Sequence, residues 1–146
     1  MKANPLLREP TPEDSLVVYL VVRKDLKMGP GKIGAQCGHA VHLLNLEYRK
    51  FCENGAFWDS MVLGSDLPNL HKRITLWESM DENGRFTKIV LGAHDKDWFK
   101  LKELYEPVTV IDAGKTEVAP CTETVMILPP MFKDERDPLL KRQRLL

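Results

Sequence analysis

The sequence lacks a long apolar run, a disulfide-forming set of cysteines and a net charge, and each absence excludes a class of protein. No apolar run approaches the roughly 20 residues that a membrane-spanning helix needs, so no membrane partner is expected. The N-terminus has neither the apolar stretch of a secretory signal nor the arginine-rich character of a transit peptide. Three cysteines in 146 residues are an odd and sparse set, which fits a reducing compartment. The sequence therefore predicts a soluble, cytoplasmic protein.

The charge and composition are those of one folded domain. The 21 basic and 21 acidic residues cancel, so any nucleic-acid surface must come from local sorting of charge. Hydrophobic residues make up 43% and charged residues 29%, which excludes a disordered, collagen-like or coiled-coil chain. Residues 1–14 contain three prolines and no periodicity. We expect them to be a flexible lead before a single domain at 15–146.

Hydrophobic periodicity predicts strands that alternate with helices. A β-branched run at 16–22 predicts a central strand buried on both faces. Apolar residues three or four apart predict a helix over 32–52 that ends at Asn54-Gly55. Residues 66–80 fit a second helix, although 74–77 could instead form a strand before a hairpin turn. Later patterns give strands at 86–93, 108–111 and 124–128 and helices at 95–105 and 139–146. This order predicts an α/β fold, a three-layer sandwich around a small mixed sheet.

A glycine-rich loop opens the first predicted helix but does not meet the requirements of a nucleotide site. Residues 29–34 spell GxGxxG, yet six residues separate them from the preceding strand, and the next strand begins only near Phe86. A Walker A loop would need glycine at position 26 and serine or threonine at 33, and neither is present. Cys37 and His39 point in different directions on a helix, and no CxxC or HExxH pattern occurs. No cofactor and no metal are expected.

One face of that helix carries a candidate site. Lys32, Gln36 and His39 recur at i, i+4 and i+7 and therefore share a face. Asp112 ends an apolar strand and leads into a glycine turn, and ligands of α/β sheets bind beyond the carboxyl ends of strands. If the strands before Lys32 and Asp112 are parallel neighbours, the two side chains meet at one edge. On the residues alone, the helix face could equally be solvated surface and Asp112 a turn residue.

Several ordered stretches resemble the type-2 peptidyl-tRNA hydrolases of archaea and eukaryotes. They are residues 19–32 (YLVVRKDLKMGPGK), 35–40 (AQCGHA), 88–91 (KIVL) and 110–116 (VIDAGKT), the last followed by Ala119-Pro120 and Thr124-Val125. The resemblance covers about residues 16–130. It implies an enzyme that hydrolyses the ester between a peptide and the 3′ ribose of tRNA, and so recycles tRNA. It also implies a three-layer α/β/α fold with a four-stranded mixed sheet. Matching positions assign catalysis to Lys32, Asp112 and Thr116, with Gln36 and His39 nearby.

The sequence departs from the family pattern at three places. Pro30 replaces the lysine that is common between the two glycines, which removes one basic contact. The segment from about 54 to 85 is longer than usual and is expected to be a helical insertion. Leu128-Pro129-Pro130 replaces the more usual Ile-Gly-Pro. These departures bear on tRNA affinity more than on chemistry.

The residues favour direct attack by water without a metal, because no serine nucleophile elbow occurs. Asp112 would orient the water beside Lys32, with Thr116 as a relay, and His39 is the competing base. Cations of the two loops are expected to bind tRNA, and they are Arg23, Lys24, Lys27 and Lys115.

Two other functions fit the same sequence. One is a non-catalytic module that binds RNA or protein on the same fold. The other is an interaction protein that uses exposed aromatic residues of the segment 56–85. A homodimer is compatible with the sequence, which does not specify the oligomeric state.

Overall fold

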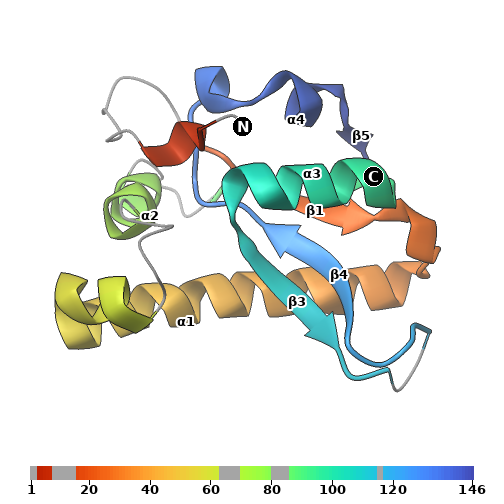
Figure 1. Ribbon diagram of the computed structural model, residues 1–146, viewed down its shortest axis with the longest axis horizontal. Helices are drawn as coiled ribbons and strands as arrows, with labels where there is room; N and C mark the ends of the chain where they lie inside the picture. Colours follow the sequence, from red (N-terminus) through yellow and green to blue (C-terminus); the bar gives the residue numbers. More distant parts are fainter. Residues whose placement is uncertain (1–2, 8–15, 63–69, 80–85, 115–116) are drawn as a thin grey trace.

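The computed structural model describes residues 3–7, 16–62, 70–79, 86–114 and 117–146 (Figure 1). The described strands are β1 (Val18–Arg23), β2 (Lys88–Ala93), β3 (Val108–Asp112), β4 (Thr122–Ile127) and β5 (Arg144–Leu145). They form one mixed sheet in the order β3-β4-β1-β2-β5, in which β1 and β2 are parallel and the other pairs antiparallel. The expected α/β class with a mixed sheet is confirmed.

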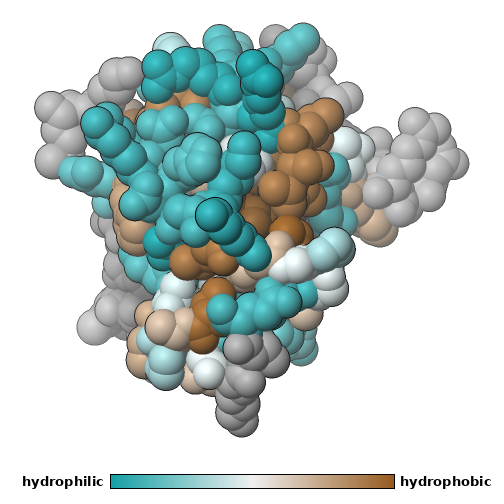
Figure 2. Space-filling model, turned by 90° about the vertical axis from the view of Figure 1, so that its right-hand side faces the viewer, coloured by the Kyte–Doolittle hydropathy of each residue, from teal (hydrophilic) through white to brown (hydrophobic). Residues whose placement is uncertain are grey.

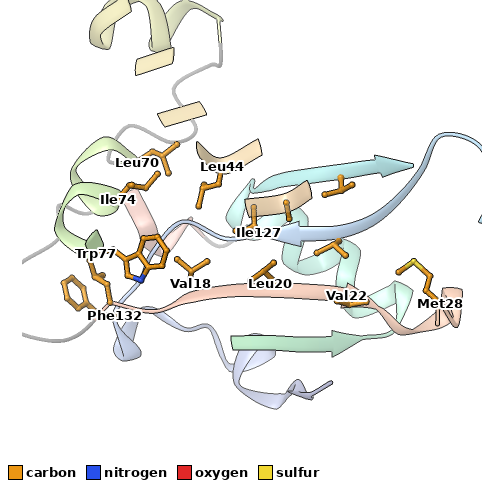
Figure 3. Close-up of a cluster of buried hydrophobic side chains, with 14 of the residues drawn as sticks. Val18, Leu20, Val22, Met28, Leu44, Leu70, Ile74, Trp77, Ile127 and Phe132 are labelled. Carbon is orange, nitrogen blue, oxygen red and sulfur yellow. The ribbon is translucent and has the colours of Figure 1, made fainter. Parts of the chain in front are cut away.

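Helices cover both faces of this sheet (Figure 1). One layer contains α1 (Pro30–Val62) and α2 (Leu70–Ser79), and the other contains α3 (Asp95–Tyr105) and α4 (Pro138–Arg142). Alternate residues of β1 face the two layers. Leu20 packs with Leu44 and Ile74 in one cluster (Figure 3), whereas Val21 packs with Trp98 in the other. This double burial is the reason why the strand carries a continuous apolar run.

The described sheet has five strands where the resemblance implied four, and the additional strand comes from the C-terminus. A helix was expected over 139–146, but α4 ends at Arg142 because Gln143 is extended, with φ −72° and ψ 143°. Beyond it, β5 pairs with the open edge of β2, and the Leu146 N–H donates to the Val90 carbonyl at 3.1 Å. A short helix at a chain end is only marginally stable, so pairing with β2 stabilises these residues more than a longer α4 would.

The region between β1 and β2 also differs in part from expectation. The predicted stop at Asn54-Gly55 is wrong, because α1 continues to Val62. A glycine inside a helix costs only about 1 kcal/mol, which does not by itself end it. The helix expected near 66–80 is confirmed as α2 over Leu70–Ser79, against the strand alternative, while its expected first and last residues lie outside the described residues.

A buried ion pair links α2 to the C-terminal segment. The Arg73 guanidinium donates to both carboxylate oxygens of Glu135, at 2.9 and 2.6 Å, and to the Pro130 carbonyl at 2.9 Å. Both side chains are about 1% exposed.

Near the other end of the chain, Asn4 donates to the Tyr105 carbonyl at 2.9 Å and Leu6 is buried, in a segment expected to be a flexible lead.

Candidate active site

The carboxylate of Asp112 lies at the centre of a polar cluster between α1 and the end of β3. Lys32, in the first turn of α1, donates from Nζ to Asp112 Oδ2 at 2.5 Å. Gln36, one turn later, donates from Nε2 to the same oxygen at 2.6 Å. The other oxygen, Oδ1, accepts the Gly114 backbone N–H at 2.6 Å. Residues 80 positions apart in the sequence therefore meet as the helix-face argument predicts.

The route by which they meet is not the one assumed from sequence. The argument required β1 and β3 to be parallel neighbours, but β4 lies between them. Because β4 is antiparallel to both, β1 and β3 still run in the same direction. Their carboxyl ends therefore lie at the same end of the sheet. There α1 crosses β4 and brings Lys32 to Asp112.

Thr124 orients Gln36, a role that the sequence did not assign to it. Its hydroxyl donates to Gln36 Oε1 at 3.1 Å, so the amide presents its nitrogen to Asp112. Thr124 reaches this position through a bulge in β4. Val110 and Ile111 are adjacent on β3 but pair with Val125 and Glu123, so that Thr124 is the extra residue. Bulges redirect side chains in this way next to functional sites, and the sequence carries no signal for this one.

Glu117 is a second residue that sequence reasoning missed. Its Oε2 accepts the Gly29 backbone N–H at 2.8 Å, immediately before α1 begins at Pro30. A carboxylate at this place interacts favourably with the helix dipole. Glu117 therefore fixes the start of the helix that carries Lys32.

The cluster holds Asp112 in its ionised form. The hydrogen bond from Lys32, the Gly114 N–H and the charge of Lys32 lower the pKa of Asp112 below its ordinary value of 3.8, against the opposing effect of burial. The hydrogen bond from Gln36 acts in the same direction. Asp112 is therefore a carboxylate at neutral pH, well suited to hold and orient a water molecule and weak as a base.

An open pocket of about 590 Å³ lies beside this cluster. The side chain of Asp112 is 7% exposed and that of Lys32 13%. His39 is exposed and lies on the wall of the pocket. Lys115 and Thr116, for which the sequence predicts roles in binding and catalysis, lie outside the described residues. The full lining comprises Lys32, Ala35, Gln36, His39, Ile111, Asp112, Ala113 and Glu117.

The basic residues of the loop before α1 are not equivalent. Arg23 is already engaged, since it donates twice to Asp25, at 3.2 and 2.6 Å, and once to the Glu123 carbonyl at 3.1 Å. Lys24 and Lys27 are exposed. Figure 2 shows the end of the molecule where β1 passes into α1, and hydrophilic residues gather over much of its upper half.

Within the described residues, no three histidine, cysteine or acidic side chains come together as a metal ligand set. No helix in that part of the chain has the length and apolar character that crossing a bilayer requires.

Comparison with known proteins matches residues 16–146 to the family model described as "Peptidyl-tRNA hydrolase PTH2". The "Peptidyl-tRNA hydrolase" of Sulfurisphaera tokodaii is 34% identical over 115 residues, which cover 77% of this chain and 84% of that protein. That of Saccharolobus islandicus is 30% identical over 130 residues, or 88% of this chain and 98% of the relative. The human "Peptidyl-tRNA hydrolase 2, mitochondrial" is 32% identical over 119 residues. These cover 77% of this chain but 54% of the human protein, so the chain spans about half of that relative's length.

Proposed function

Because the chain belongs to the PTH2 family of peptidyl-tRNA hydrolases, we propose that the pocket beside Asp112 is where its ester substrate reacts. The chain is an enzyme that hydrolyses peptidyl-tRNA. The observation that carries the assignment of the site is the meeting of Lys32, Gln36 and Asp112 on the wall of one open pocket. A module that only binds RNA or protein has no need for an ionised carboxylate held at such a place.

The reaction needs one water molecule and no covalent intermediate. Asp112 accepts a hydrogen bond from the water and orients its oxygen toward the ester carbon, so that orientation rather than proton abstraction is its larger role. Attack forms a C–O bond to the water oxygen and places negative charge on the former carbonyl oxygen. Lys32 and the N-terminal end of α1 stabilise that charge. The C–O bond to the ribose then breaks, the 3′ oxygen takes up the proton that the attacking water loses, and peptide acid and free tRNA are released.

Two further residues have assigned roles in this proposal. Thr116 relays a proton, as its position in the family motif suggests. His39 is the alternative base to Asp112, and turnover of the variant His39→Asn separates the two: a large loss of kcat favours His39, whereas a near-normal kcat favours Asp112.

The central test removes the charge of Asp112 without changing its shape. Asp112→Asn is expected to reduce kcat/KM for peptidyl-tRNA by about a thousandfold, comparable with the loss of an oxyanion donor. Lys32→Ala is expected to reduce kcat/KM by about a hundredfold or more, because it removes the ammonium group that stabilises the developing charge on the carbonyl oxygen. The matched control is Asp134→Asn, on an exposed residue of the 3₁₀ turn Lys133–Glu135. Near-normal rates in both site variants, with the fold intact by circular dichroism, would exclude this pocket.

We further propose that Lys24, Lys27 and Lys115 contact the tRNA backbone and that Arg23 contributes less. Lys24 and Lys27 are exposed on the loop that leads into α1, whereas Arg23 is paired with Asp25.

We place the enzyme in the cytoplasm, since its sparse cysteines fit a reducing compartment. The human relative is named mitochondrial, so fractionation of cells that express the native protein separates the two locations.

A further inference from the structure

The outer edge of β3 presents main-chain groups that have no strand partner within the described residues. β3 is the first strand in the sheet order, with β4 on its inner side. The Asp112 carbonyl accepts the Cys121 N–H at 2.8 Å on that inner side, and the Thr124 hydroxyl lies 3.5 Å from the Val110 carbonyl. Main-chain groups alternate in direction along an antiparallel strand. Those of Thr109 and Ile111 therefore point outward.

This open edge begins at the reaction pocket. Ile111 precedes Asp112 directly and lines the same pocket. Its side chain is 64% exposed, against 7% for Asp112. Thr109 lies two residues earlier, about 7 Å farther along the strand. A molecule held at Asp112 therefore has two sets of main-chain donors and acceptors beside it.

The peptide part of the substrate fits this edge by its chemistry. An enzyme that releases tRNA from many different peptides needs contacts that do not depend on side chains, and the main chain is the part that all peptides share. An extended peptide added to a sheet edge is recognised in this manner. We propose, in an inference that rests on the proposed function, that the peptidyl group binds along β3. Its main chain pairs with that of Ile111 and then with that of Thr109.

The direction of the peptide follows from the position of the ester. The ester carbon belongs to the C-terminal residue of the peptide, and in the proposed function it lies at Asp112, the last residue of β3. The rest of the peptide then extends back toward Val108, so it runs parallel to β3. A peptide of one residue reaches Ile111 at most, and about three residues are needed to reach Thr109.

The protein-side test uses proline, which removes one N–H and is tolerated on sheet edges. Ile111→Pro removes an outward N–H and leaves the bonds between β3 and β4 in place. We expect kcat/KM for tripeptidyl-tRNA to fall about tenfold, as for one or two lost hydrogen bonds. N-acetyl-aminoacyl-tRNA, which has a single residue, should lose less.

The matched control lies on the opposite edge of the sheet. Leu146 donates its N–H to Val90, so the N–H of Leu145 points away from β2. Leu145→Pro therefore makes the same change far from the pocket and should leave kcat/KM unchanged. Ile111→Ala shortens the side chain but keeps the N–H, and should cost less than Ile111→Pro. An equal loss in these two Ile111 variants would overturn the proposal in favour of a side-chain contact.

A substrate-side test needs no variant and does not depend on how Ile111→Pro folds. We expect wild-type enzyme to cleave tripeptidyl-tRNA several-fold faster than a substrate with N-methyl groups on the peptide amides. Equal rates for the two would overturn edge pairing while leaving the proposed hydrolytic site intact, which Asp112→Asn tests separately. A second copy of the chain is the rival occupant of the edge. A dimer in sedimentation that Ile111→Pro dissociates would also overturn the proposal.

Discussion

Two ion pairs each join a helix of the α1–α2 layer to a distant segment, and they differ in what surrounds them. Arg73 and Glu135 are both about 1% exposed, and the pair uses two donors and two acceptors. Glu135 also accepts the Phe132 N–H at 2.8 Å. Lys32 and Asp112 make a single contact at the wall of an open pocket.

We expect this difference to separate a pair that serves stability from a pair that serves turnover. A bidentate pair that is sealed from solvent holds two buried charges against each other, and the loss of one partner leaves the other as an uncompensated buried charge. A pair at a pocket wall keeps lone pairs and protons that a substrate can use. The first pair should therefore control stability and the second turnover, and each of the following experiments tests that division.

The largest effect on stability is expected for Arg73→Met. This change leaves the Glu135 carboxylate buried without its guanidinium, which costs about 3–5 kcal/mol in the free energy of unfolding. Urea unfolding measures the loss, and kcat per folded molecule should stay at the wild-type value. A variant of normal stability and reduced kcat would contradict the division.

The double variant Arg73→Met/Glu135→Leu supplies the control for that experiment. Replacing a buried ion pair by apolar residues of similar volume is often neutral or stabilising. Most of the lost stability should therefore return in the double variant. If it does not, packing around α2 rather than the uncompensated charge explains the loss.

Thr124→Val tests a residue that we expect to contribute both to stability and to turnover. The substitution keeps the shape but removes the hydroxyl that bonds Gln36 Oε1, and Gln36 is 3% exposed. Gln36 Oε1 is then buried without the Thr124 donor and the amide is held by Asp112 alone, so kcat should fall about tenfold with a loss of about 1–3 kcal/mol in stability. Thr124→Ser keeps the hydroxyl and should restore kcat. Unchanged kcat in Thr124→Val would show that Gln36 does not need this support.

The acid dependence of stability sharpens the comparison at Asp112. Its pKa is lower in the folded protein than the ordinary 3.8, chiefly through Lys32. The ionised form of Asp112 therefore adds to the free energy of unfolding above about pH 4. This contribution is lost as the pH falls through the lowered pKa of the folded protein. The stability advantage of wild type over Asp112→Asn should shrink as the pH falls below about 4 in urea titrations. An advantage that grew on acidification would mean that the pKa is raised.

Much of the fold was predictable because local patterns and tertiary structure agree. The helix over 95–105 has its apolar side and a following proline at 107 in the sequence, and α3 has those bounds. β5 was missed because a two-residue strand is defined by the edge of β2, which no local pattern reveals. α1 was predicted too short because an Asn-Gly pair is a weak stop inside a long amphipathic helix.

The site was predictable where a topological rule or a motif covers it. Lys32 and Asp112 follow strands that end at the same edge, so their meeting could be anticipated. Thr124 could not be identified, because its orientation depends on one extra residue in β4 relative to β3. Glu117 could not be identified either, since an acidic residue in a turn gives no sign that it will accept the N–H of Gly29.

The smallest effect concerns two cations of the loop before α1, where the same division between engaged and available groups recurs. Arg23 pairs with Asp25 and lies 5.0 Å from the centre of the Phe99 ring, so Arg23→Gln should lower stability more than tRNA affinity. Lys27 is exposed, and Lys27→Gln should weaken tRNA binding about two- to threefold at low salt. It should also reduce the slope of log K against log salt by about 0.7–0.9, the share of one phosphate contact. Binding titrations over a range of salt concentrations measure both variants, and a larger change of slope in Arg23→Gln would mean that Arg23 leaves Asp25 to bind the phosphate backbone.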